Sequence, residues 1–259
     1  MISDPVTPRS VLIVGGTSGI GLATARRFAS DGSTSVTIVG RDAVRGEAAR
    51  AALAAEYPTA KVALSLGNAN DADTAERIVA EVLALHGKID VMVVATVGAA
   101  LPDLLAAIPT GRIAEDLMEQ VLGPMLMSRA VLPAMRLRQS GVIITVASDA
   151  GKVATPGETV IGAAMAAIIM FSRTLAMEAK RDGIRINCVT PSLVQGTGTH
   201  DRIFAHPFAS RLFEKAIQAA SLGVAEAADL AALIHFLASP EAARITGQAV
   251  SVNGGISAQ

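Results

Sequence analysis

The sequence predicts an α/β fold in which a mostly parallel, doubly wound, seven-stranded sheet carries helices on both faces. Three observations predict this fold class. Short runs rich in β-branched residues alternate with longer helical patterns, which favours parallel pairing through right-handed crossovers. The inner runs are apolar throughout, as expected of strands that are covered on both faces. A glycine-rich turn joins the first run to the first helix.

We assign residues 1–259 to one domain, because no linker, repeat or low-complexity segment divides the sequence. The expected strands are 10–14, 35–39, 61–66, 90–95, 141–147, 184–190 and 248–252. The expected helices are 19–30, 42–56, 71–86, a long helical region that ends near 139, 157–181 and 226–238. The weakly patterned stretch 192–221 follows a strand end, where open α/β sheets bind ligands. We interpret it as a substrate loop or lid, with a plain surface connection as the alternative.

The composition excludes several classes of protein. The net charge is -1 and no run is rich in Lys or Arg, so we expect no nucleic-acid partner. The single cysteine, Cys188, excludes an internal disulfide and indicates a buried strand residue in a reducing compartment. Residues 1–10 lack the basic start and apolar stretch of a signal peptide. The apolar run 160–171 is shorter than the ~20 residues of a membrane span, so we expect a cytoplasmic protein without a membrane segment.

The first strand leads into the turn Gly-Gly-Thr-Ser-Gly-Ile-Gly, residues 15–21, at the start of a helix. Glycines let the backbone turn tightly and approach a pyrophosphate, and the free N–H groups of the helix favour the anion. This strand, turn and helix predict a dinucleotide site of the Rossmann type. Its expected contacts are Gly15, Thr17, Ser18, Gly19 and Ile20.

The end of the second strand indicates which dinucleotide is bound. An acidic residue there would accept hydrogen bonds from the adenosine ribose. Here Gly40 leaves room and Arg41 can pair with a 2′-phosphate, which favours NADP(H) over NAD(H). The alternative is that Arg41 is a solvated surface side chain.

Four segments carry a family resemblance. They are the glycine turn described above, the strand 141–148 that ends in Ser148, the stretch 171–191, and the C-terminal run 245–255. Together with the alternating pattern, they resemble the short-chain dehydrogenase/reductase family along nearly the whole chain. The resemblance implies Ser148 as a catalytic residue, a homodimer or homotetramer, a small-molecule substrate and no metal. It also implies a further set of cofactor contacts: Asn68, Ala69, Gly98, Pro191, Val194 and Thr197.

The resemblance fails at the residues that handle the proton. In the family a Tyr and a Lys stand four residues apart on one face of the helix after the serine strand. Those positions here are Ile161 and Met165, and neither side chain can donate a proton or carry charge. The only tyrosine, Tyr57, lies elsewhere in the sequence, and the helix asparagine of the family aligns with Gln120.

Other polar residues remain as candidates for proton transfer. The ionisable residues nearest to Ser148 in sequence are Asp149, Lys152 and Glu158, and no motif places any of them. His200 and His206 lie in the expected lid, where they are either proton donors or solvated loop residues.

Three functions are compatible with the sequence. The first is an NADP(H)-dependent oxidoreductase that uses Ser148 with an unrecognised acid, a water molecule or the substrate's own proton. The second is a non-redox enzyme, such as a cyclase, isomerase or lyase, that reuses the cleft. The third is a non-catalytic dinucleotide-binding or scaffold protein. A cleft lined by Ile161, Val153 and Leu193 would favour a hydrophobic substrate, such as a small carbonyl compound.

Overall fold

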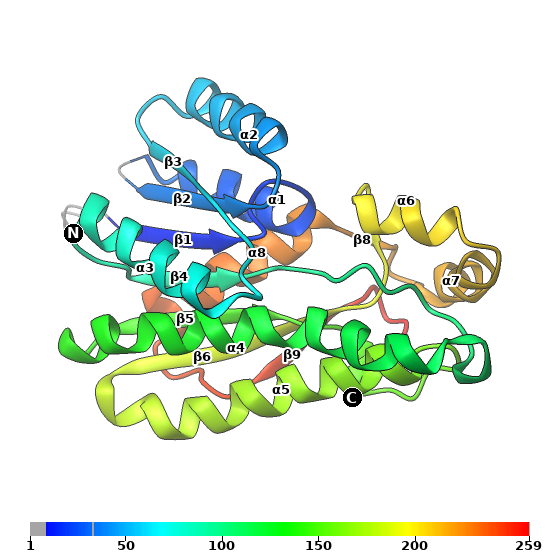
Figure 1. The fold of residues 1–259 in the computed structure, drawn as a ribbon. Helices are drawn as coiled ribbons and strands as arrows, with labels where there is room; N and C mark the ends of the chain where they lie inside the picture. Colours follow the sequence, from blue (N-terminus) through cyan, green and yellow to red (C-terminus); the bar gives the residue numbers. More distant parts are fainter. Residues whose placement is uncertain (1–8, 33, 259) are drawn as a thin grey trace.

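The computed structural model describes residues 9–32 and 34–258, so most of the segment 1–10, in which the sequence predicts no signal peptide, lies outside the described residues. Seven parallel strands form one sheet in the order β3-β2-β1-β4-β5-β6-β9 (Figure 1). Their bounds are β1 (Ser10–Val14), β2 (Ser35–Gly40), β3 (Lys61–Leu66), β4 (Val91–Val94), β5 (Gly141–Val146), β6 (Ile184–Pro191) and β9 (Ala249–Val252). The doubly wound parallel sheet is confirmed, and its order reverses between β1 and β4.

Helices cover both faces of this sheet. One face carries α1 (Gly19–Ala29), α2 (Ala43–Glu56) and α8 (Ala227–Ala238), and the other carries α3 (Ala72–His86), α4 (Ile113–Leu137) and α5 (Thr159–Ala179). Local chemistry fixes several helix ends. The carboxylate of Asp71 accepts a hydrogen bond from the backbone N–H of Thr74 at the start of α3, and Gly87 ends that helix with φ of 72°.

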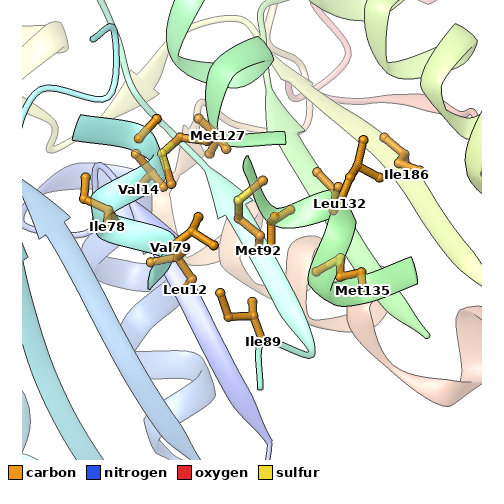
Figure 2. Close-up of a cluster of buried hydrophobic side chains, with 14 of the residues drawn as sticks. Leu12, Val14, Ile78, Val79, Ile89, Met92, Met127, Leu132, Met135 and Ile186 are labelled. Carbon is orange, nitrogen blue, oxygen red and sulfur yellow. The ribbon is translucent and has the colours of Figure 1, made fainter. Parts of the chain in front are cut away.

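Each face of the sheet has its own apolar core. Strand residues alternate between the two cores, because successive side chains of a strand point to opposite faces. Leu12 and Val14 of β1 pack with α3 and α4, as Figure 2 shows around Ile78 and Met127. Val11 and Ile13 of β1 pack with Phe28 of α1 on the opposite face. The strands therefore need apolar residues at every inner position.

Helix α5 differs from the other helices in how apolar it is. Residues 159–182 are long and apolar enough to cross a membrane by composition alone. In this fold the helix packs on the sheet and on α4 instead, with Leu175 and Ala176 in the core. One stripe of the helix remains exposed in the single chain, including Met170 at 58% and Met177 at 61%.

The segment 192–221 is mainly helical. It contains β7 (Val194–Gln195), α6 (Gly198–Phe204) and α7 (Pro207–Ala219), and β7 pairs with β8 (Ala225–Glu226). The side chain of Thr197 caps α6, and the side chain of His206 caps α7 just before Pro207 at its first position. Both helices lie beyond the carboxyl ends of the strands (Figure 1).

Phe28 tests the core that joins α1 to α8. Its side chain is fully buried and its ring lies 5.0 Å from the ring of His235. We expect Phe28→Ala to lower the free energy of unfolding by about 3–5 kcal/mol, because it leaves a cavity that the sheet cannot fill. Val44→Ala, at a side chain that is 83% exposed, should change it by less than about 0.5 kcal/mol. Urea denaturation followed by circular dichroism measures both values, and equal effects would contradict this account of the core.

Candidate functional site

The glycine turn lies between the ends of β1, β2 and β4. Gly15 has φ of +81°, and a Cβ there would lie 2.6 Å from the carbonyl oxygen of Ala95. A Cβ on Gly21 would collide with the carbonyl oxygen of Gly15. Only glycine therefore lets α1 start this close to the strand ends. The backbone N–H groups of Gly15 and Gly16 both donate to Val39, which ties the turn to β2.

The N-terminus of α1 is suited to an anion. Ser18 occupies the cap position and is exposed, and its side chain makes no capping hydrogen bond to the described residues. The first turn of the helix contains no acidic residue. Its N–H groups and the positive end of its dipole are therefore available to a phosphate. The residues of this turn fit the pyrophosphate of a dinucleotide.

The end of β2 has the features expected for a phosphate on the adenosine. A Cβ on Gly40 would lie 2.6 Å from Cγ2 of Thr17, so the buried Thr17 side chain fills the space that Gly40 leaves. Arg41 is exposed and forms no hydrogen bond or ion pair with residues 9–32 and 34–258. Its guanidinium is free to meet a 2′-phosphate.

The remaining cofactor candidates lie along the same edge of the sheet. Asn68 is exposed beyond β3 and accepts a hydrogen bond from the N–H of Asn70, whereas Ala69 is buried in the core. Pro191 ends β6, and Val194 is buried in the core on the face of the sheet that carries α1 and α8. Thr197 reaches the glycine turn from across the cleft, because a Cβ on Gly19 would lie 3.5 Å from its methyl group.

Gly98 is held between α4 and α6. Its N–H donates to Oε1 of Gln120 at 3.0 Å, and its carbonyl oxygen accepts from the guanidinium of Arg202 at 3.4 Å. The next residue, Ala99, makes the same two kinds of contact, to Glu119 and Arg202. The loop after β4 is therefore fixed to α4 and bridged to α6, so Gln120 positions a backbone loop.

Ser148 lines a cavity of about 110 Å³ at the carboxyl ends of the strands. Its hydroxyl oxygen accepts a hydrogen bond from the N–H of Ala150 at 3.2 Å and starts the short 3₁₀ helix η3 (Asp149–Gly151). Polar residues and the α7 residues Leu212, Phe213 and Ala216 both contribute to the cavity wall. Its other lining residues are Asp149, Ala150, Val153, Thr155, Glu158, Ser192, Leu212, Phe213, Ala216, Ile256 and Ser257.

Asp149 is tied into the structure by its neighbours. Its carboxylate accepts from Ser251 Oγ at 2.7 Å and from the side-chain amide of Asn253, and it lies 3.2 Å from Nζ of Lys152. Burial opposes the charge, but the hydrogen bonds from Ser251 and Asn253 together with Lys152 hold the pKa of Asp149 below its ordinary value. This carboxylate is therefore a structural anion that joins η3 to the C-terminal segment.

Glu158 has the opposite environment. It stands at the cap position of α5 and faces the same cavity as Ser148. Burial raises the pKa of its carboxyl to about 7, and the Thr155 hydroxyl only partly opposes that shift. An acid with this pKa exchanges protons readily near neutral pH. Ser148 and Glu158 therefore share one pocket, although their spacing in sequence matches no known motif.

The positions expected for Tyr and Lys are apolar in the structure as well. Met165 is buried in a cluster with Ala147 and Ile168, and Ile161 packs against that cluster. Cys188 belongs to the same cluster, and burial raises the pKa of its thiol to about 11. The buried, unpaired cysteine predicted from the sequence is confirmed. Neither the two apolar side chains nor this thiol can deliver a proton near neutral pH.

The remaining candidates for proton transfer lie away from the cavity. The ring nitrogen Nδ1 of His206 accepts from the N–H of Ala209, and His200 lies 3.3 Å from the carboxylate of Asp201. Lys152 contacts Ser251 and Asp149 rather than the cavity. Tyr57 donates to Glu56 on the surface beyond α2.

The apolar lining predicted from the sequence was partly wrong. Val153 lines the cavity, but Ile161 and Leu193 are not among its described lining residues. Leu193 is buried instead under α6 and α7, against Ile203 and Phe213. The sequence missed the contribution of α7 and of Ile256 and Ser257. The amphipathic spacing of Leu212, Phe213 and Ala216 could have indicated a helix with one buried face.

The strand order, the glycine turn and the cavity at the strand ends define the dinucleotide-binding class of α/β proteins. A family model described as enoyl-(acyl carrier protein) reductase matches residues 14–257. Human dehydrogenase/reductase SDR family member 4 is 31% identical over 257 residues, covering 97% of this chain and 88% of its own. A 3-oxoacyl-(acyl-carrier-protein) reductase of Chlamydia muridarum is 32% identical over 256 residues, covering 96% of this chain and 97% of its own.

Solved structures show the same fold. Levodione reductase superposes with a TM-score of 0.90 at 27% identity, covering 97% of this chain and 98% of its own. YwfH, described as an NADPH-dependent reductase of bacilysin biosynthesis, has a TM-score of 0.88 over 98% of this chain and 100% of its own. Its identity of 23% makes it a likeness of fold alone. The chain belongs to the short-chain dehydrogenase/reductase family, whose members are oxidoreductases that use a nicotinamide dinucleotide.

Asp149 gives a test of the polar network beside the cavity. We expect Asp149→Asn to lower the free energy of unfolding at pH 7 by about 3 kcal/mol, because Lys152 is left buried without its carboxylate. The stabilisation by Asp149 is complete above the ordinary carboxyl pKa of 3.8 and is lost as the pH falls through the lowered folded-state value.

The difference between wild type and Asp149→Asn should therefore shrink below about pH 4. Urea denaturation at several pH values between about 3 and 7 measures it. Asp73→Asn, at an exposed carboxylate in the first turn of α3, is the matched control and should have little effect at any pH. A difference that stays constant across this range would contradict the role given to the Asp149 carboxylate.

Proposed function

We propose that this protein is an NADP(H)-dependent oxidoreductase that acts on a small hydrophobic carbonyl compound or the corresponding alcohol, with Ser148 and without the Tyr and Lys of its family. The observation that carries the proposal is the cavity itself. Ser148 and Ser192, which follow β5 and β6, line it, and the glycine turn and Thr197 lie at the same edge of the sheet. A substrate in this cavity and a dinucleotide on the turn would share one cleft.

Residues of the chain would hold the cofactor along this edge. The N–H groups at the start of α1 would hold the pyrophosphate, and Arg41 would hold the 2′-phosphate. When bound, NADPH supplies the hydride that reduces a carbonyl carbon. Asn68, Gly98, Pro191, Val194 and Thr197 are proposed to line the rest of the cofactor cleft, on the family resemblance and their place at the strand ends.

The substrate would bind between unlike walls. Leu212, Phe213 and Ala216 of α7 supply an apolar side, and Ser148 supplies a hydroxyl that can donate to a substrate oxygen. Ser148 is available for this, because its hydrogen bond to the N–H of Ala150 uses the hydroxyl oxygen as an acceptor and leaves the proton to donate. These walls favour a compact, mostly apolar molecule with one polar oxygen.

Arg41 tests the choice of cofactor. We expect Arg41→Ala to weaken NADPH binding by about tenfold or more, because charge-assisted hydrogen bonds to the 2′-phosphate are lost, and to leave NADH binding unchanged. Isothermal titration calorimetry measures both affinities. Arg27→Ala, at an exposed arginine near the other end of α1, is the control and should bind NADPH as wild type does. Wild-type protein that does not bind NADPH would contradict the proposal.

We also propose that two copies of the chain pair through α4 and α5. The exposed stripe of α5 includes Ala163, Ala166, Met170 and Met177, and Met118 is exposed on α4. Methionines at this density on one helix face are typical of a surface that another chain covers. The resemblance to the family implies such a homodimer, or a homotetramer built from it.

A charge on this stripe tests the pairing. We expect Ala166→Glu to convert the protein to monomers, because the new carboxylate would be buried without a partner between two α5 helices. Light scattering after size exclusion measures the mass. Val44→Glu, on the exposed face of α2, is the control and should keep the wild-type assembly. A wild-type protein that is already monomeric would rule out the interface.

A further inference from the structure

We propose that Glu158 is the group that exchanges a proton with the substrate oxygen bound by Ser148. This assignment rests on the proposed function, and it gives the cavity the acid that Ile161 cannot supply. Both side chains line one cavity, although ten positions of chain separate them. Ser148 enters it from the end of β5, and Glu158 enters it from the start of α5. A substrate oxygen between them would meet a hydroxyl on one side and a carboxyl on the other.

Glu158 is partly buried beside an apolar wall of the cavity. Phe213 of α7 lines that wall, and the ring of Phe208 packs directly on Gly157. The carbonyl oxygen of Gly157 accepts a hydrogen bond from the N–H of Asp103 at 2.8 Å, which holds the loop after β4 against the same place. Desolvation of this kind disfavours the carboxylate and raises the pKa to about 7.

The other charged groups near the cavity leave this role to Glu158. The carboxylate of Asp149 is occupied by Ser251, Asn253 and Lys152 and stays ionised. The carboxylate of Asp103 accepts a hydrogen bond from the N–H of Leu104 and is not among the described cavity-lining residues. No basic side chain is among those lining residues either. Glu158 is thus the titratable residue of the cavity whose protonated form can donate a hydrogen bond to a substrate oxygen.

The proton balance of the reaction is simple. As the carbonyl carbon gains the hydride that NADPH supplies, the π electrons of C=O move to the oxygen. The O–H bond of the Glu158 carboxyl breaks, and a new O–H bond forms on the substrate, which leaves as an alcohol. NADPH is oxidised, the carbonyl is reduced, and water reprotonates the Glu158 carboxylate. Reduction therefore needs protonated Glu158 and slows above about pH 7, whereas alcohol oxidation needs the carboxylate and slows below it.

The first experiment uses wild-type protein and acetophenone as the probe ketone. Carbon-13 NMR of glutamate carboxyl groups should show Glu158 titrating near pH 7. Acetophenone should raise that midpoint, because the ketone oxygen accepts a hydrogen bond only from the protonated acid. Its affinity should fall by about tenfold between about pH 5.5 and 8.5. A Glu158 midpoint near its ordinary value, or one that acetophenone leaves unchanged, overturns the assignment.

The second experiment compares Glu158→Gln with Glu214→Gln, which removes the same charge from the exposed face of α7. The amide introduced by Glu158→Gln can still donate a hydrogen bond but cannot transfer a proton. Acetophenone should therefore bind this variant equally well at all pH values. The kcat for NADPH-dependent reduction should fall by roughly 10²- to 10⁴-fold and lose its decline above about pH 7. Glu214→Gln should keep the wild-type affinity, rate and pH profile.

The outcomes separate the two proposals. If wild-type protein reduces acetophenone and Glu158→Gln keeps its rate and pH profile, the proton-transfer role is wrong while the oxidoreductase function stands. If wild-type protein does not bind NADPH but acetophenone still shifts the Glu158 titration, the oxidoreductase function is wrong, and Glu158 is a hydrogen-bond partner of the bound ketone rather than its proton donor. Loss of folding in Glu158→Gln does not affect the wild-type titration, which tests the assignment alone.

Discussion

The site depends on the requirement that a parallel sheet be covered on both faces. Each strand must return to the same edge through a helix, so all seven carboxyl ends lie together. The reversal of strand order between β1 and β4 opens the space into which the glycine turn fits. Segments far apart in sequence, from Gly15 to Ser257, therefore reach one edge of the sheet.

Two carboxylates near that edge show how packing decides chemistry. Asp149 is buried among donors and a lysine, so its charge holds the C-terminal segment to η3. Burial acts on Glu158 without such a set of donors, and the Thr155 hydroxyl opposes it only in part, so its neutral form is favoured. Both carboxyl groups line one cavity. The carboxylate of Asp149 stabilises the fold, whereas the carboxyl of Glu158 can gain or lose a proton near neutral pH.

The sequence predicted the sheet, its helices and the glycine turn, because these depend on local periodicity and on glycine geometry. Its placing of Ile161 and Met165 at the positions of the family's Tyr and Lys stays a prediction, and the structure adds that Met165 is buried with Ile161 packed against its cluster. It could not predict that Glu158 is desolvated. That environment comes from α7, about fifty positions further along the chain, and no local pattern around Glu158 records it. Leu193 was misplaced for the same reason, since the packing of α6 and α7 over it was not foreseen.

Gly157 connects the shape of the lid to the acidity below it. This glycine has φ of +92°, and any Cβ there would strike the ring of Phe208. A larger side chain there would displace the ring or the loop, so the glycine lets α7 pack against the segment that carries Glu158. The missing side chain at position 157 therefore helps to set how closely α7 covers the pocket.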